Sequence, residues 1–240
     1  MKCILLAAGY ATRLYPLTEN FPKPLLPVTG KPIIDWLVDD VSPLIDEFVV
    51  VSNHKFAEQF RNWAEQKPQN IRIIDDGTES NESRLGAVKD IQLAVEEDED
   101  YLVMAGDNVL DFSLCSFIAF AQKKGTSCVM CHEENRLGSL RKTAVIEFDE
   151  NHLITSYEEK PQTPRGNHAV PPFYYYRAAD IARIQEALGA GCGYDAPGSF
   201  AAWLSGKVDM HAYVMPGHRY DIGDMESYQF VQETYKGITQ

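Results

Sequence analysis

Short apolar runs alternate with helical patterns through the first 134 residues of this 240-residue chain, and this alternation restricts the possible folds more than any other feature. The expected strands are Lys2–Ala7, Phe48–Ser52, Ile71–Ile74, Tyr101–Ala105 and Ser127–His132. The expected helices are Pro32–Val41, Lys55–Glu65, Leu85–Glu97 and Ser113–Lys123. Repeated strand–helix units of this length predict an α/β fold with a mainly parallel sheet and with ligands at the carboxyl ends of its strands.

The pattern changes after about Asn135. Two apolar runs, Thr143–Phe148 and Leu153–Glu158, flank a polar tetrapeptide and predict an antiparallel hairpin. Later elements are expected at Tyr174–Tyr176, Ala178–Leu188, Ser199–Leu204, Asp209–Val214 and Met225–Tyr235. The sheet is therefore predicted to be mixed, with a small antiparallel part. We expect a single domain over residues 1–240, with a first half at 1–134 and a second half at 135–240.

The charge of the chain excludes some classes of partner. A formal net charge of −13, from 22 basic and 35 acidic residues, argues against nucleic acid or an anionic membrane surface, because both need a basic face. The first 31 residues are the exception. They hold Lys2, Arg13, Lys23 and Lys31 against Glu19 alone, which leaves 18 basic and 34 acidic residues for the rest. Positive charge is thus concentrated near the amino terminus.

The cysteines indicate a reducing compartment. Their number is odd, and most lie in apolar segments: Cys3, Cys115, Cys128, Cys131 and Cys192. The Cys128–Cys131 pair has no second pair to complete a zinc site, so we interpret this segment as a buried strand. The chain has neither a secretory pattern nor an apolar run of membrane-spanning length. A soluble, cytoplasmic protein is expected.

The loop after the first expected strand is suited to phosphate. Ala8, Gly9 and Ala11 keep side chains small, so that backbone N–H groups can approach an anion. Arg13 and Lys23 then supply charge, the latter within a rigid Pro-Lys-Pro segment. This spacing favours a phosphate-binding loop over an ordinary strand-to-helix turn.

The stretch LAAGYATRLYPLTENFPKPLLPVTGKPII, residues 6–34, resembles the signature of the sugar-1-phosphate nucleotidyltransferases, also called nucleotide-sugar pyrophosphorylases. The resemblance implies their Rossmann-like three-layer fold, in a short form without a carboxy-terminal β-helix domain. Ala11 stands where the family usually has a glycine. Because alanine resists positive φ, we expect this position to adopt an ordinary backbone conformation.

The resemblance also implies a reaction and a set of nucleotide contacts. A phosphate oxygen of the acceptor attacks the α-phosphorus of a nucleoside triphosphate, and pyrophosphate leaves. Arg13 and Lys23 match the family's catalytic cations. The expected nucleotide-binding residues are Leu6, Ala7, Ala8, Gly9, Tyr10, Ala11 and Thr12, with Asn81 and Gly86 at the base. The sequence around Gly86 fits neither the pyrimidine-preferring nor the purine-preferring pattern, so the base stays open.

Two aspartates are expected to share Mg²⁺. Asp107 follows an apolar strand and resembles the family's G-D motif, and Asp221 resembles its late D-x-G motif. Paired carboxylates suit Mg²⁺, which offsets the negative charge that builds up during phosphoryl transfer. Asp224 is expected to be the N-cap of the last helix instead of a metal ligand.

The resemblance implies a nucleotide-binding half at residues 1–134 and an acceptor-binding half at residues 135–240. The acceptor site is expected at Asn108, Ala144, Glu159 and Lys160. Glu159 and Lys160 resemble the family's E-E-K-P element, in which the lysine holds the acceptor phosphate and the glutamate its hydroxyl groups. Ala144 replaces a family glycine and adds a methyl group to this pocket. A hexose phosphate and a smaller acceptor both remain open.

We expect the partners to be a nucleoside triphosphate and a sugar 1-phosphate or another small phosphorylated acceptor, and a homodimer is compatible with the sequence. One rival function is a cytidylyltransferase acting on phosphocholine or a phosphonate. Another is a non-catalytic nucleotide-binding regulatory module. A nicotinamide oxidoreductase is disfavoured, because the loop lacks G-x-G-x-x-G.

Overall fold

The structure is a computed structural model that describes residues 1–96 and 98–239. It forms two compact units, each built from separate stretches of the chain. Unit 1 contains Met1–Leu85, Met104–Cys115 and Pro216–Gln240, and unit 2 contains Gly86–Val103 and Ser116–Met215. Glu97, the expected end of one helix, and Gln240 lie outside the described residues. The expected assignment of one half of the chain to each substrate stays a prediction.

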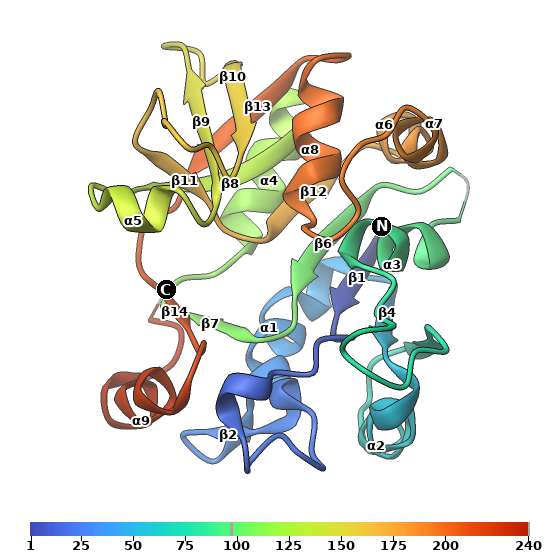
Figure 1. Ribbon diagram of the computed structural model, residues 1–240. Coiled ribbons are helices and arrows are strands. Elements are labelled where there is room, and N and C mark those ends of the chain that lie inside the picture. Colours follow the sequence, from blue (N-terminus) through green and yellow to red (C-terminus); the bar gives the residue numbers. More distant parts are fainter. Residues whose placement is uncertain (97, 240) are drawn as a thin grey trace. The chain divides into compact units, whose positions relative to one another are not determined.

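Parallel strands form the centre of unit 1. They are β1 (Lys2–Leu6), β4 (Glu47–Ser52) and β5 (Ile71–Asp75), in the order β1-β4-β5. The last residues of β6 (Tyr101–Ala105) lie on the other side of β1, where Gly106 N donates to Leu6 O at 3.0 Å. Helix α2 (His54–Ala64) packs on β4 and β5 (Figure 1). The carboxyl ends of β1 and β6 therefore open side by side.

The rest of unit 1 gathers around one apolar cluster. It comprises the 3₁₀ turns η1 (Thr12–Leu14), η2 (Lys23–Leu25) and η3 (Ser42–Leu44), helix α1 (Ile33–Val41), the paired strands β2 (Pro27–Val28) and β3 (Lys31–Pro32), the paired strands β7 (Asn108–Leu110) and β14 (Arg219–Asp221), and helix α9 (Met225–Thr234). Leu14, Ile33, Val109, Ile222 and Val231 belong to the cluster. Burial of these side chains ties the amino-terminal loop to the last 25 residues.

Unit 2 is built on a largely antiparallel set of strands. Their order is β10 (Ile154–Glu159), β9 (Ala144–Phe148), β11 (His168–Val170), β8 (Ser127–Glu133), β12 (Phe173–Tyr176) and the beginning of β6, with β13 (Met210–Val214) parallel to β8. The helices are α3 (Ala87–Ala94), α4 (Cys115–Lys124), α5 (Leu137–Leu140), α6 (Ala178–Ile181), α7 (Ile184–Gly189) and α8 (Gly198–Ser205). Helix α8 packs on β10, and Phe120 of α4 contacts Tyr213 of β13.

The predicted α/β class with a mixed central sheet is confirmed, and most long elements lie within a few residues of their expected positions. The helix expected from Ala178 to Leu188 is divided into α6 and α7, because Arg183 adopts ψ 3°. Helix α3 begins only at Ala87, since Gly86 has φ 94°. The three-residue strands β7, β11 and β14 were not predicted, since such short segments carry no periodic pattern.

Two further expectations concern individual segments. Cys128 and Cys131 lie buried and unpaired in β8, as the strand interpretation predicted. Within residues 1–96 and 98–239, every helix is too short or too polar to cross a lipid bilayer.

Candidate active site

The loop that follows β1 is held in place by a buried asparagine. Ala7 N donates to Val51 O at 2.9 Å, which continues the ladder between β1 and β4. Asn53 Nδ2 then donates to Ala8 O at 3.0 Å, while Asn53 Oδ1 accepts from Phe56 N at 3.0 Å and caps α2. Because Asn53 has no solvent exposure, it joins the loop rigidly to the helix. Asn53 was not predicted as a site residue, because its N-cap position ahead of α2 is its only signal in the sequence.

Tyr10 anchors the middle of the loop. Its hydroxyl donates to Thr78 O at 2.9 Å, and its ring is 5% exposed. Gly9 beside it is exposed, with open space where a side chain would begin. The loop therefore turns its aromatic residue inward and leaves backbone accessible at Gly9.

Ala11 adopts the conformation that the sequence argued against. Its φ and ψ are 47° and 41°, in the left-handed region, so the expectation of an ordinary conformation was wrong. Two hydrogen bonds hold its carbonyl oxygen, from Leu14 N at 2.9 Å and from Thr18 Oγ1 at 2.8 Å. These bonds and the packing of η1 offset a left-handed alanine's cost of about 1–2 kcal/mol. The fold thus keeps the backbone that a glycine would adopt.

A cavity of about 130 Å³ opens beside this loop, wholly within unit 1. Three polar side chains that the sequence had singled out line it together: Arg13, Lys23 and Asp107. Its other lining residues are Leu6, Ala7, Gly9, Ala11, Pro24 and Gly223. The loop, the Pro-Lys-Pro segment and the two aspartate motifs therefore converge on one small space.

Lys23 is the buried cation of this cavity. It begins η2 after Pro22 and is only 7% exposed. Its Nζ lies 2.7 Å from Asp107 Oδ2, and the side chain of Asp107 is 36% exposed. A buried ammonium group needs such a partner, because desolvation of an unpaired charge is costly.

Asp107 belongs to a chain of charged and polar groups that continues to Asp221. Its Oδ1 accepts from Asn108 Nδ2 at 2.7 Å, and Asn108 Oδ1 accepts from Arg219 Nη1 at 2.6 Å. Arg219 Nη1 also lies 3.7 Å from Asp221 Oδ2. Asn108 and Asp221 are paired directly across β7 and β14. Arg219 was not predicted either, because its position two residues before Asp221 is its only signal in the sequence.

The donor set at β7 and β14 fits Mg²⁺. Two carboxylates from neighbouring segments supply hard oxygen ligands, and Mg²⁺ commonly takes one or two carboxylates together with substrate phosphates. The side chain of Asp221 is 58% exposed and accessible. Among the residues that the structure describes, no group of three or more His, Cys, Asp or Glu could hold a metal ion without further ligands. Asp107 and Asp221 would therefore need phosphate oxygens to complete the coordination of Mg²⁺.

Arg13 lies against the late D-x-G turn. A Cβ atom at Gly223 would lie 3.7 Å from Arg13 Nη2, so glycine leaves room for the guanidinium group. The predicted N-cap role of Asp224 is confirmed, because its side chain accepts from Ser227 N in a capping box. This bond, together with nearby Arg13, keeps the pKa of Asp224 below its ordinary value.

The residues expected at the base are not brought together within one unit. Asn81 belongs to unit 1, is exposed, and accepts from Arg84 Nη1 at 3.2 Å. Gly86 belongs to unit 2, where a Cβ atom would lie 2.6 Å from Tyr194 O. Glycine at this position is thus required by the packing of Tyr194 as well as by its positive φ. Thr12 is exposed on η1 and does not line the cavity.

Three of the expected acceptor residues are neighbours in unit 2. Ala144 pairs directly with Glu159 across β9 and β10, and Lys160 N donates to Thr143 O at 3.1 Å. Lys160 is exposed and adopts φ 48°. Burial raises the pKa of Glu159, and the charge of Lys160 opposes this shift. The fourth residue, Asn108, is 1% exposed in unit 1 and bonded to Asp107 and Arg219.

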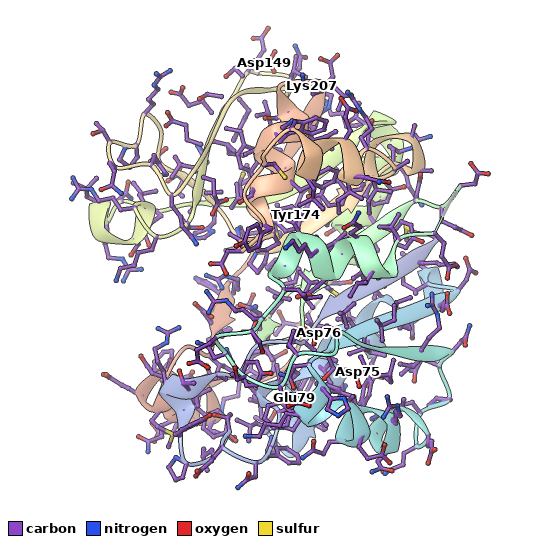
Figure 2. The ribbon with its side chains drawn as sticks, turned by 45° about the vertical axis from the view of Figure 1, so that its right-hand side comes forward. Asp75, Asp76, Glu79, Asp149, Tyr174 and Lys207 are labelled. Atoms are coloured by element: carbon purple, nitrogen blue, oxygen red, sulfur yellow. The ribbon has the colours of Figure 1, made fainter. Side chains whose placement is uncertain are left out.

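An acidic group lies at the end of β5, where Asp75, the last residue of the strand, is near Asp76 and Glu79 (Figure 2). His54 Nδ1 is 2.7 Å from Asp75 Oδ2, and this contact raises the pKa of His54. Burial raises the pKa of Asp76. Asp76 Oδ1 accepts from Thr78 N, so the group supports the turn that holds Tyr10.

A strand-end loop, two cations and Asp107 around one cavity define the class of protein, an α/β protein whose site is suited to phosphate groups. The family assignment agrees with this class. The sequence profile of the family described as nucleotidyl transferase matches residues 2–237, and the chain belongs to this family.

Individual relatives are more distant. The chain is 33% identical over 203 residues to a glucose-1-phosphate thymidylyltransferase of Actinoplanes, covering 78% of this chain and 61% of the relative. It is 29% identical to the bifunctional protein GlmU of Methanocaldococcus jannaschii, covering 70% and 38%, and 26% identical to a putative mannose-1-phosphate guanyltransferase of Sulfolobus acidocaldarius, covering 77% and 50%. The chain thus spans half or less of the last two. A UDP-glucose pyrophosphorylase structure shares the fold, with TM-score 0.80, 22% identity, and 98% and 97% of the two chains covered.

Proposed function

We propose that this protein transfers a nucleotidyl group from a nucleoside triphosphate to a sugar 1-phosphate, with release of pyrophosphate and in the presence of Mg²⁺. The observation that carries the proposal is the cavity of unit 1, in which Arg13, Lys23 and Asp107 lie around the loop from Leu6 to Thr12. Membership of the nucleotidyl transferase family supports it. So do the names of two relatives, a glucose-1-phosphate thymidylyltransferase and a putative mannose-1-phosphate guanyltransferase.

In this proposal, backbone N–H groups near Gly9 bind the triphosphate, and Arg13 contacts its phosphate oxygens through a planar fork. An oxygen of the acceptor phosphate forms a bond to the α-phosphorus. The bond from the α-phosphorus to the bridging oxygen breaks, and its electron pair leaves with pyrophosphate. Lys23 stabilises the charge that grows on this leaving group, and a buried position strengthens the effect.

Asp107 and Asp221 would hold Mg²⁺ in the loaded enzyme, where the ion neutralises phosphate charge. Lys23 pairs with Asp107, and Arg219 lies beside Asp221, so both carboxylates have a cation close by. Glu159, beside Ala144, would accept hydrogen bonds from the acceptor's hydroxyl groups. Five unpaired cysteines support a cytoplasmic location.

A pyrophosphate-release screen tests the proposal. The common nucleoside triphosphates are each combined with a panel of sugar 1-phosphates and with phosphocholine, with and without Mg²⁺. The expected result is pyrophosphate release that needs both substrates and the metal ion. Pyrophosphate release in which phosphocholine is the only acceptor that reacts would indicate the rival cytidylyltransferase function. Nucleotide binding without release in any combination would contradict catalysis and leave a binding module.

A further inference from the structure

Buried polar atoms in unit 2 lack hydrogen-bond partners in the described part of the chain. Three of them are Tyr157 Oη and Glu159 Oε2 on β10 and Tyr176 Oη on β12. Each such group carries a desolvation penalty of about 1–3 kcal/mol unless something else compensates it. Tyr157 Oη and Glu159 Oε2 both border Gly198. The ring of Tyr176 stacks on that of Tyr174, which is labelled in Figure 2, with ring centroids 5.7 Å apart. Their arrangement needs a physical reason.

Gly198, the first residue of α8, provides the space in which two of these atoms lie. A Cβ atom built on Gly198 would lie 2.2 Å from Glu159 Oε2 and 3.3 Å from Tyr157 Oη. The first distance is below any real Cβ contact, so a side chain at residue 198 would displace the carboxylate. The backbone of Gly198 does not require glycine, because its φ lies outside the left-handed region. A larger residue at position 198 would therefore force the Glu159 carboxylate to move.

The amino end of α8 is a favourable place for a carboxylate. No side chain caps this eight-residue helix, whose N-cap is Pro197. The partial positive charge of a helix N-terminus stabilises a neighbouring anion by about 0.3–1 kcal/mol or more when partly buried. The close approach of Glu159 Oε2 to Gly198 restricts the orientations open to this carboxylate.

We propose that Gly198 is a positioning residue that seats the Glu159 carboxylate against the amino end of α8, so that Glu159 can recognise hydroxyl groups of the acceptor. The inference rests on the proposed function and refines it. A carboxylate seated in one place accepts hydrogen bonds from hydroxyl groups of the acceptor, so its displacement should weaken acceptor binding and leave nucleotide binding unchanged.

The test is a double-mutant cycle with Gly198→Ala, Glu159→Ala and the double variant. Gly206→Ala at the other end of α8 is the matched control, because Gly206 has φ −84° and its nearest contact would be an ordinary 3.6 Å. Thermal unfolding and the KM values for acceptor and nucleotide are measured for each. Gly198→Ala is expected to lower the melting temperature and to raise the acceptor KM about tenfold or more, with the nucleotide KM unchanged.

The double variant distinguishes a specific contact between residues 198 and 159 from a non-specific loss of stability. Removal of the Glu159 side chain removes the clash, so the double variant should regain the melting temperature lost by Gly198→Ala, and its acceptor KM should match that of Glu159→Ala. If Gly198→Ala does not fold, Glu159→Asp in that background, with a shorter side chain, should restore folding. Additive effects, or a wild-type acceptor KM in Gly198→Ala, would overturn the inference and leave the proposed function intact. No turnover of any sugar 1-phosphate by the wild type would overturn both, even if the unfolding data confirm the contact.

Discussion

Replacement of Lys23 by alanine separates its chemical role from its structural one. The ammonium group pairs with Asp107 at 2.7 Å, but the side chain of Asp107 is 36% exposed and can be hydrated again when the lysine is lost. The loss of stability should therefore be about 1 kcal/mol, or about 2–4 °C in melting temperature for a chain of this size. Loss of one preorganised charge at the leaving group should lower turnover about 10²–10³-fold.

Lys67→Ala is the matched control in the same unit. Lys67 pairs with Asp35, which is 5% exposed and also accepts from Trp63 Nε1. Removal of Lys67 leaves a buried carboxylate and should cost about 2–3 kcal/mol, which is more than Lys23→Ala costs. Turnover should nevertheless stay near the wild-type value, because Lys67 does not line the cavity.

Both variants are compared by thermal unfolding and by steady-state pyrophosphate release at saturating substrates. Lys67→Ala should lose more stability than Lys23→Ala, whereas Lys23→Ala should lose more turnover than Lys67→Ala. Turnover of Lys23→Ala within about threefold of wild type would refute the leaving-group role, since one such charge is worth far more. An equal loss of turnover in Lys67→Ala would show that general destabilisation explains both.

Three further predictions follow from the geometry. Ala11→Gly should leave the melting temperature unchanged or raise it by about 2 °C, because relief of left-handed strain offsets the greater chain entropy of glycine; a clear fall in unfolding scans would refute the strain. Asp107→Asn and Asp221→Asn should each raise the Mg²⁺ concentration for half-maximal rate about tenfold or more, and an unchanged metal titration in both would exclude a shared ion. Contact with Asp75 raises the pKa of His54. The contribution of this contact to folding stability is therefore full below the ordinary pKa of 6.5 and is lost as pH rises through the folded pKa. NMR titration should show that the pKa of His54 returns toward 6.5 in Asp75→Asn.

The sequence predicts the strand–helix alternation and the cavity side chains well, because both leave local signals. Apolar periodicity marks β1 and β4, and the spacing of Arg13 and Lys23 marks the phosphate loop. Asp107 shows itself by following an apolar strand. These features depend on residues that are close in the sequence.

Features that depend on long-range contacts were not predictable. Ala11 is held in the left-handed region by bonds to its carbonyl oxygen, and no local propensity predicts that conformation for alanine. Arg219 meets Asn108 only because β14 pairs with β7 more than 100 residues away. In the sequence, Gly198 resembles an ordinary turn glycine, and its contact with Glu159 is seen only in the folded structure. The conformation or role of each of these residues depends on a partner that the local sequence does not reveal.

The most direct test of the proposed bond formation, between an acceptor phosphate oxygen and the α-phosphorus, follows the oxygen atoms of the acceptor. A sugar 1-phosphate that carries ¹⁸O at its three terminal phosphate oxygens is incubated with the preferred nucleoside triphosphate and Mg²⁺. The masses of the products are then measured by mass spectrometry. Attack of the acceptor phosphate on the α-phosphorus predicts a nucleoside diphosphate sugar that retains all three labels and a pyrophosphate that has none. Label in the pyrophosphate, or the absence of a nucleoside diphosphate sugar, would contradict the proposed reaction.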